Sequence, residues 1–97
     1  MDINRFELST DLTIYHTETL KKELSSFIEN STDLEIDLKQ VREVDLAGLQ
    51  LILSLKKTVD NQGGRLKFIN PPDRLLDIAV TTGVNDDIIF ADQIRKQ

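Results

Sequence analysis

The pattern that most constrains the fold is a strict alternation of apolar and charged residues that leads into a long helical pattern. Residues 34–38 read Leu-Glu-Ile-Asp-Leu, as in a strand with one buried face. Residues 45–61 carry apolar side chains at helical spacing, and Gly63-Gly64 fits a left-handed C-terminal cap. Residues 65–69 form another strand pattern. A strand, a helix and a strand in this order predict parallel strands and an α/β fold.

The N-terminal part predicts a hairpin followed by a helix. Residues 3–8 and 12–15 both alternate, and Ser9-Thr10-Asp11 between them has the short polar side chains that are typical of turns. Thr17 then fits a helix N-cap, because apolar residues follow at three- and four-residue spacing, namely Leu20, Leu24, Phe27 and Ile28. We therefore expect two antiparallel strands before the first helix.

The C-terminal part predicts a third helix and a last short strand. Asn70-Pro71-Pro72-Asp73 favours a helix start, since a proline in the first turn loses no hydrogen bond, and Gly83 ends that helix. Residues 86–91 fit a marginal strand and residues 92–97 a polar tail. The order β-β-α-β-α-β-α-(β) predicts a single α/β domain over residues 1–97, with a mixed sheet covered by helices.

The composition excludes much of the chemistry that a small domain could perform. The 97 residues include no cysteine and one histidine, so thiol chemistry, cysteine-ligated metals and multi-histidine sites are ruled out. We expect no catalytic residue, metal or cofactor. With 12 basic and 17 acidic residues, a net charge of −5 argues against nucleic acid as the main partner. Neither a targeting signal nor a membrane-length apolar run is visible, which predicts a cytoplasmic domain without membrane insertion.

The most informative segment is residues 44–50, which read Val-Asp-Leu-Ala-Gly-Leu-Gln. Asp45 is well placed as a helix N-cap, since its carboxylate can accept from free amides at the positive helix end. Gly48 in the first turn lowers helix propensity. A glycine there indicates that something approaches the backbone closely, whether a neighbouring strand, an anion or a partner protein.

The helix that follows is apolar over more than half its circumference. One stripe holds Leu49, Ile52, Leu53 and Val59, and a second holds Ala47, Leu51 and Leu55. The first stripe can cover the sheet, but the second needs another helix or a partner to cover it. We expect most of it to be buried within the domain.

At this point the chain resembles a STAS domain, the family of the bacterial anti-sigma factor antagonists. The resemblance covers nearly the whole chain and rests on residues 11–15 with the helix 17–24, on the strand 34–38, and on the signature Asp45-Leu46-Ala47-Gly48-Leu49. It implies a four- to five-stranded sheet covered by three to four helices, and a protein-binding switch rather than an enzyme. It also implies the class of partner: an anti-sigma factor that is often a serine kinase, a chemosensory or partner-switching assembly, or an ABC transporter for lipids.

One position departs from the family. The family's switch residue is a Ser or Thr directly after the signature Asp, where a partner kinase phosphorylates it, and here that position is Leu46. Leucine cannot accept phosphate, so release of a partner by a new charge is not available at this site. Leu46 is either an exposed interface anchor or a residue that packs over its own helix.

Other polar residues have simpler explanations. His16 could lie at the partner-binding end of the domain or sense pH, but a solvated histidine in a loop is the simpler interpretation. Asp37 and Asp45 flank one loop, but no base, nucleophile or glycine-rich loop accompanies them, which favours capping over acid–base or magnesium chemistry. The remaining hydroxyls are alternative phosphoacceptors that nothing local marks: Ser9, Thr10, Ser54, Thr58, Thr81 and Thr82.

Three functions follow in order of support. The first is a non-catalytic adaptor that binds a sigma-factor or chemosensory regulatory protein without phosphorylation at residue 46. The second is a STAS subunit that binds the ATPase of an ABC-type lipid transporter, and the third is a small-molecule or nucleotide-binding enzyme. The residues expected at the partner surface are Thr10, Asp11, Asp45, Leu46, Ala47, Gly48 and Leu49.

Overall fold

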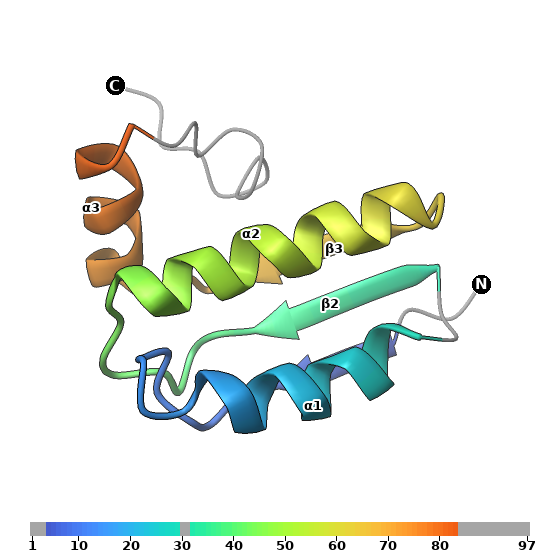
Figure 1. The fold of residues 1–97 in the computed structure, drawn as a ribbon, viewed down its shortest axis with the longest axis horizontal. Coiled ribbons are helices and arrows are strands. Elements are labelled where there is room, and N and C mark those ends of the chain that lie inside the picture. Colours follow the sequence, from blue (N-terminus) through green and yellow to red (C-terminus); the bar gives the residue numbers. More distant parts are fainter. Residues whose placement is uncertain (1–3, 30–31, 84–97) are drawn as a thin grey trace.

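Three parallel strands form the sheet, in the spatial order β1-β2-β3. The computed structural model describes residues 4–29 and 32–83 (Figure 1). Its elements are β1 (Asn4–Glu7), α1 (Thr17–Ile28), β2 (Asp33–Asp37), α2 (Leu46–Asn61), β3 (Arg65–Ile69) and α3 (Asp73–Thr81). Glu35 pairs with Arg5 on one side and with Lys67 on the other, so the three strands are in register. The α/β class predicted from the alternating patterns is confirmed.

The predicted hairpin and mixed sheet are wrong for the part of the chain that the structure describes. Residues 9–12 do not turn back but continue in the direction of β1, and Leu12 forms an isolated parallel bridge with Val44. The Leu12 amide donates to the Glu43 carbonyl at 2.9 Å, and the Asp45 amide donates to the Leu12 carbonyl at 3.0 Å. Within residues 4–29 and 32–83 the sheet therefore has three strands rather than the four or five that were predicted. The strand predicted at 86–91 and the tail at 92–97 lie outside the described residues.

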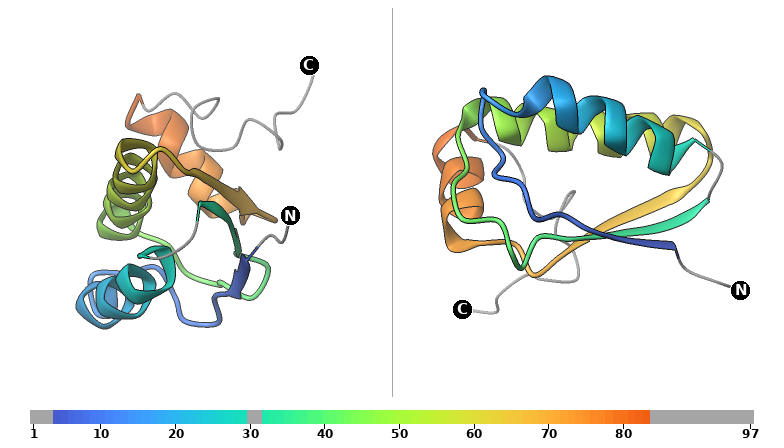
Figure 2. Two further views of the ribbon diagram at one scale, coloured as in Figure 1. Left: turned by 90° about the vertical axis from the view of Figure 1, so that its right-hand side faces the viewer. Right: turned by 90° about the horizontal axis from the view of Figure 1, so that it is seen from below.

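Both long helices lie on one face of the sheet, as the right-hand view of Figure 2 shows. The strand residues that face them are buried, among them Ile36 and Phe68 in the middle of β2 and β3. The alternate strand residues form the opposite face, where Arg5 and Glu35 make an ion pair of 2.8 Å. One apolar and one charged face are what the alternation of residues 34–38 predicts.

Most of both apolar stripes of α2 is buried inside the domain. The buried α2 residues include Leu49, Ile52 and Val59 of the first stripe and Leu51 and Leu55 of the second. Helix α1 packs beside α2 and contributes Leu20, Leu24 and Ile28 to the same core. Intramolecular burial of the wide apolar arc is therefore confirmed.

The helix ends follow the sequence signals closely. Asp45 is the N-cap of α2 as predicted, and Gly63, with φ of 78°, follows its end in the left-handed region. The predicted cap of α1 is displaced by one residue: His16 is the N-cap, and the Thr17 hydroxyl donates to the Ile14 carbonyl at 3.3 Å instead. Pro72 caps α3, and Gly83 after its end has φ of 80°.

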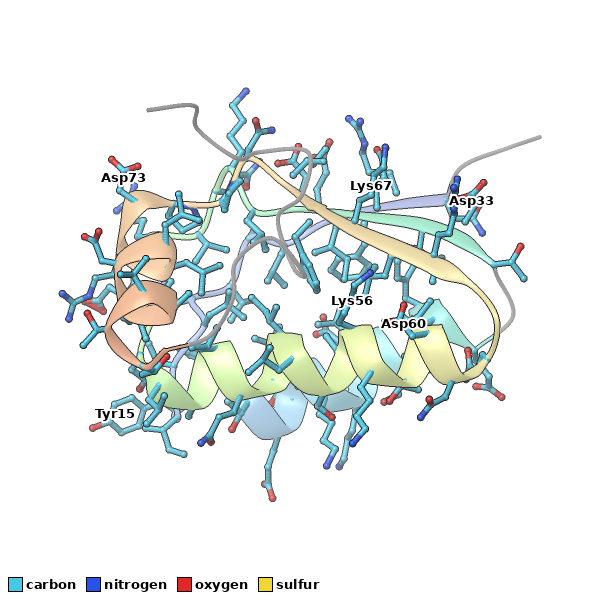
Figure 3. All side chains as sticks on the ribbon, turned by 90° about the horizontal axis from the view of Figure 1, so that it is seen from above. Tyr15, Asp33, Lys56, Asp60, Lys67 and Asp73 are labelled. Carbon is cyan, nitrogen blue, oxygen red and sulfur yellow. The ribbon has the colours of Figure 1, made fainter. Side chains whose placement is uncertain are left out.

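The side of α2 that meets β3 is not wholly apolar. The Lys56 ammonium group donates to the Leu66 carbonyl at 3.4 Å and lies 3.5 Å from the Asp60 carboxylate (Figure 3). The lysine stem thereby covers part of the helix–sheet junction while its charge stays paired. Among the described helices, none has an apolar stretch of the length needed to cross a bilayer.

Candidate functional site

The predicted partner-binding residues come together where the carboxyl ends of β1 and β2 meet the N-terminus of α2. Two loops meet there, residues 8–16 between β1 and α1 and residues 38–45 between β2 and α2. Because β1 and β2 are parallel, both loops leave the sheet at the same edge. Thr10 and Asp11 therefore lie beside the start of α2 although more than 30 residues separate them from it.

Asp45 joins three segments of the chain at this edge. One carboxylate oxygen accepts from the Gly48 amide at 3.1 Å, and the other accepts from the Ile14 amide at 3.0 Å. The Asp45 backbone amide donates to the Leu12 carbonyl. The Ile14 amide, together with the amides of the first turn of α2, lowers the pKa of the Asp45 carboxyl and keeps it ionised. Asp45 thus fixes the N-terminus of α2 against the loop before α1.

Gly48 makes this contact possible. A Cβ atom at residue 48 would lie 2.6 Å from the Leu12 carbonyl carbon and 2.7 Å from the Leu12 Cβ, closer than such atoms approach in proteins. Of the three explanations that the sequence leaves open, close approach of a neighbouring chain segment is the correct one. Glycine has a low helix propensity, but its lack of a side chain lets the Leu12 backbone pack against the first turn of α2.

Asp11 holds the second loop in the same way. Its carboxylate accepts from the Arg42 amide at 3.0 Å and from the Glu43 amide at 3.2 Å. These two amides, that of Arg42 first, lower the pKa of the Asp11 carboxyl. Asp11 therefore ties the β1–α1 loop to the β2–α2 loop, and Asp45 makes a second tie a few residues away.

An exposed apolar rim crosses this fixed edge. We define the apolar rim as Ile14, Tyr15 and Leu46, whose exposed fractions are 60%, 88% and 49%. Figure 3 places Tyr15 pointing outward beside the first turn of α2. The Leu46 side chain is half exposed, so it is accessible to a partner while its inner side packs on the domain.

The other residues of the signature segment 45–49 are less exposed than Leu46. Ala47 is partly exposed, whereas Gly48 and Leu49 are buried and serve the helix start and the core. Ile14 and Tyr15 were missed as candidates because the predicted hairpin placed them in a strand. The lack of a glycine in Ser9-Thr10-Asp11 is the signal against a tight hairpin that could have revealed them.

A groove between α1 and α2 continues the apolar rim along the molecule. It has a volume of about 320 Å³ and starts at Ile14 and Ala47. Polar, charged and apolar side chains line it. Besides Ile14 and Ala47, the lining residues are Thr17, Glu18, Lys21, Gln50, Leu51 and Ser54. A partner that covers the rim could therefore extend a side chain between the two helices.

Asp37, at the end of β2, also has a structural role. Asp37 accepts from the Lys39 amide at 2.9 Å and from the Asn70 side-chain amide at 3.1 Å, and the Asn70 contact is the main cause that lowers the pKa of Asp37. Asp37 and Asp45 thus bind separate groups instead of forming a carboxylate pair. No cluster of three metal-ligating side chains occurs among residues 4–29 and 32–83.

Comparison with known proteins decides the family. A family model described as "Mlab, STAS domain" matches residues 4–91. The chain belongs to the STAS domain family. It is also 33% identical over 81 residues to the anti-sigma-B factor antagonist of Bacillus subtilis (strain 168), an alignment that covers 84% of this chain and 74% of that protein.

Solved structures confirm the STAS fold. A candidate anti-sigma factor antagonist from Thermotoga maritima superposes with a TM-score of 0.77 at 18% identity, over 91% of this chain and 76% of that chain. The murine anion transporter Slc26a9 contains the same fold, with a TM-score of 0.69 and 18% identity, over 80% of this chain and 13% of the transporter. The chain is thus a STAS domain of the anti-sigma factor antagonist type, which supports a regulatory role by partner switching.

Proposed function

We propose that this STAS domain is a non-catalytic cytoplasmic adaptor that binds a regulatory protein of a sigma-factor or chemosensory pathway. An anti-sigma factor is the kind of partner that the name of the B. subtilis relative suggests. The observation that carries the proposal is the half-exposed Leu46 directly after the Asp45 cap, with Ile14 and Tyr15 beside it. The partner surface consists of this apolar rim and the Thr10–Asp11 loop.

The rigidity of the site supports this proposal. Asp45 and Asp11 bond four backbone amides from three segments, so the rim residues start from a fixed backbone. A surface that is ordered before binding loses less conformational entropy when a partner docks. Tyrosine is also enriched among the residues that contribute most to protein–protein affinity.

Leu46 gives the adaptor a different regulation from that implied for the family. Without a hydroxyl at this position a kinase cannot introduce a dianion into the interface, so binding persists in the presence of ATP. The test is to isolate the partner with the wild-type chain as bait, and then to incubate both proteins with ATP. We expect no phosphate on this chain and an intact complex. Phosphate on a Ser or Thr, with release of the partner, would contradict regulation without phosphorylation.

A second candidate is a permanent subunit that binds the ATPase of an ABC-type lipid transporter. The apolar Leu46 favours it, because a surface that no phosphorylation can switch suits a stable complex. This function predicts co-purification with a nucleotide-binding subunit and a changed ATPase rate when the domain is removed. An ATPase that never co-purifies with the tagged chain, while a cytoplasmic regulatory protein does, would decide for the adaptor.

A further inference from the structure

The outer surface of α1 and α2 is covered by no element that the structure describes. The two helices lie side by side on one face of the sheet, and both start at the end of the molecule where the strands end (Figure 1). The groove of about 320 Å³ runs between them from that end. Ile14 belongs both to the apolar rim and to the lining of the groove, so the rim lies at the mouth of the groove.

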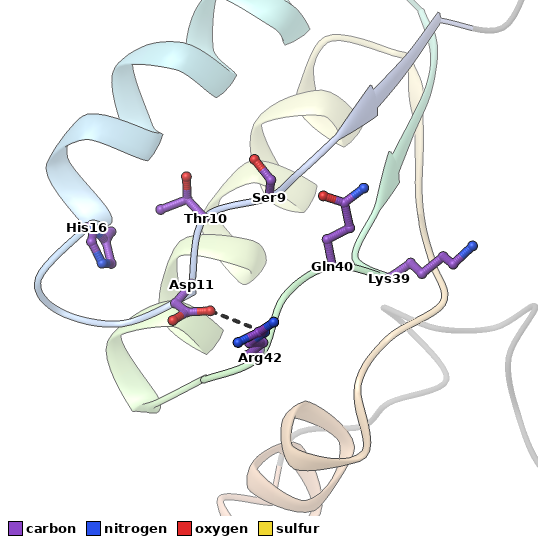
Figure 4. A pocket seen from close by; sticks show the side chains of 7 residues that line it. All are labelled: Ser9, Thr10, Asp11, His16, Lys39, Gln40 and Arg42. Atoms are coloured by element: carbon purple, nitrogen blue, oxygen red, sulfur yellow. Dashed lines mark hydrogen bonds between the residues drawn. The ribbon is translucent and has the colours of Figure 1, made fainter.

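The rim is presented on a backbone that is held in place. The Arg42 amide donates to the Asp11 carboxylate at 3.0 Å (Figure 4), and the Ile14 amide donates to the Asp45 carboxylate at 3.0 Å. Tyr15 follows directly and is 88% exposed. Burial of this ring against a second surface is favourable, and little conformational entropy of the loop remains to be lost.

The α1 side of the groove carries two opposite charges without a partner in the described part of the chain. Glu18 and Lys21 both line the groove, and neither makes an ion pair or a side-chain hydrogen bond with residues 4–29 or 32–83. They are three residues apart and therefore lie on the same side of α1. In a two-fold contact, each pairing between two residues is made twice. If two copies of α1 cross in opposite directions, Glu18 of each copy faces Lys21 of the other.

From these observations we infer that the face formed by α1 and α2 binds a second copy of this chain, with the two-fold axis passing through the groove. The axis reverses the groove, so the rim of each copy lies over the end of the other groove that Lys21 and Ser54 mark. Ile14 and Tyr15 then leave water, while the two reciprocal Glu18–Lys21 pairs fix the relative direction of the helices. Because much of the groove lining is polar, the dimer is weak and depends on concentration.

This inference goes beyond the proposed function, because it concerns the chain alone. Where both hold, a partner on the rim and a second copy exclude one another, and self-association limits the amount of free adaptor. Failure to self-associate would leave the partner surface untouched, so the two claims fail separately.

The test is analytical ultracentrifugation of the full chain from micromolar to millimolar concentration. We expect a reversible equilibrium between monomer and dimer. NMR spectra over the same dilution series should show shifts confined to the amides of residues 14–21 and 46–54. A chain that stays monomeric throughout, or dilution shifts that map to another surface, would overturn the inference.

The two charges provide the specific test. We expect Lys21→Glu to weaken dimerisation by about tenfold or more, because it places carboxylates opposite each other in both pairs. The double substitution Glu18→Lys with Lys21→Glu exchanges the charges and should restore the wild-type dissociation constant. Lys22→Glu is the matched control, since it makes the same change in net charge at an exposed neighbour outside the groove lining. Equal weakening by Lys21→Glu and Lys22→Glu, or no recovery in the double variant with its helical circular dichroism intact, would contradict the proposed contact.

Discussion

Asp45 is the residue on which the site depends most, because its two carboxylate oxygens serve different segments. Asp45→Ala removes the Gly48 and Ile14 hydrogen bonds together. We expect it to lower the free energy of unfolding by about 1–2 kcal/mol, the usual cost of losing an N-cap. Asp45→Asn keeps an oxygen for the Gly48 amide and replaces the other by a donor, so it should cost less. Urea denaturation of the three proteins measures both effects, and equal stability of all three would contradict this role.

The same carboxylates predict how stability changes with pH. The pKa values of Asp11, Asp37 and Asp45 are lowered in the folded chain from an ordinary value of 3.8. A lowered folded-state pKa stabilises the protein above the unfolded-state pKa, and this contribution is lost as the pH falls through the folded-state value. We therefore expect the free energy of unfolding to decline below about pH 4, and to decline less steeply in Asp45→Asn. Parallel pH profiles for the two proteins would be evidence against the Asp45 contribution.

Gly48 tests the close approach of Leu12 to α2. In an isolated helix Gly→Ala is stabilising, but here the added Cβ would overlap the Leu12 backbone. We expect Gly48→Ala to destabilise the domain by about 1–3 kcal/mol. Gln50→Ala, at an exposed position two residues later in the same helix, controls for helix propensity and should be neutral or slightly stabilising. If chemical denaturation shows that both substitutions stabilise the domain, the contact with Leu12 does not exist in solution.

At the scale of elements, the two loops at the carboxyl edge of the sheet behave as one unit because Asp11 connects them. Asp11→Ala removes the acceptor of the Arg42 and Glu43 amides. Amide hydrogen exchange should then accelerate at residues 42 and 43, while the protection of the core of α2 is kept. Thr10→Ala, one residue earlier, should make no such change, because the Thr10 side chain has no hydrogen bond to any residue that the structure describes. Unchanged exchange in Asp11→Ala would show that the loops are held by other contacts.

The elements that were predicted correctly are those whose signals are local. Residues 34–38 alternate, Asp45 marks the start of α2, and Gly63 marks its end, and each lies within one residue of its expected place. The displaced cap of α1 shows the limit of such signals. Thr17 has the right side chain for a cap, but its hydroxyl donates to the Ile14 carbonyl, so the helix begins one residue earlier than a capping threonine would allow.

At the scale of the whole molecule, the sequence could not predict which segments of the chain lie side by side. Residues 12–15 have a strand-like pattern, but the pattern does not say whether they pair with residues 3–8 or with the segment before α2. The Asp11 and Asp45 carboxylates decide it, since each reaches a backbone more than 30 residues away. The exposed rim follows from this long-range pairing, which explains why Leu46 was foreseen and Ile14 and Tyr15 were not.

The molecule separates its core from its site. The long helices and the sheet enclose the apolar core, while the apolar rim lies at the edge where β1 and β2 end. Substitutions on the rim can therefore change binding without removing core contacts. A loss of affinity in such a variant can therefore be distinguished from a loss of folding.

The most direct test is the affinity of the captured partner for the Leu46→Asp chain, measured by isothermal titration calorimetry beside wild type and Val80→Asp. Val80 is an apolar residue of α3 that is 67% exposed and is not part of the apolar rim, so its substitution adds the same charge at another exposed apolar position. We predict that Leu46→Asp weakens binding by at least about tenfold, or 1.4 kcal/mol, and that Val80→Asp binds like wild type. Wild-type affinity of Leu46→Asp, in a chain that is shown to be folded, would contradict the claim that the start of α2 is the partner surface.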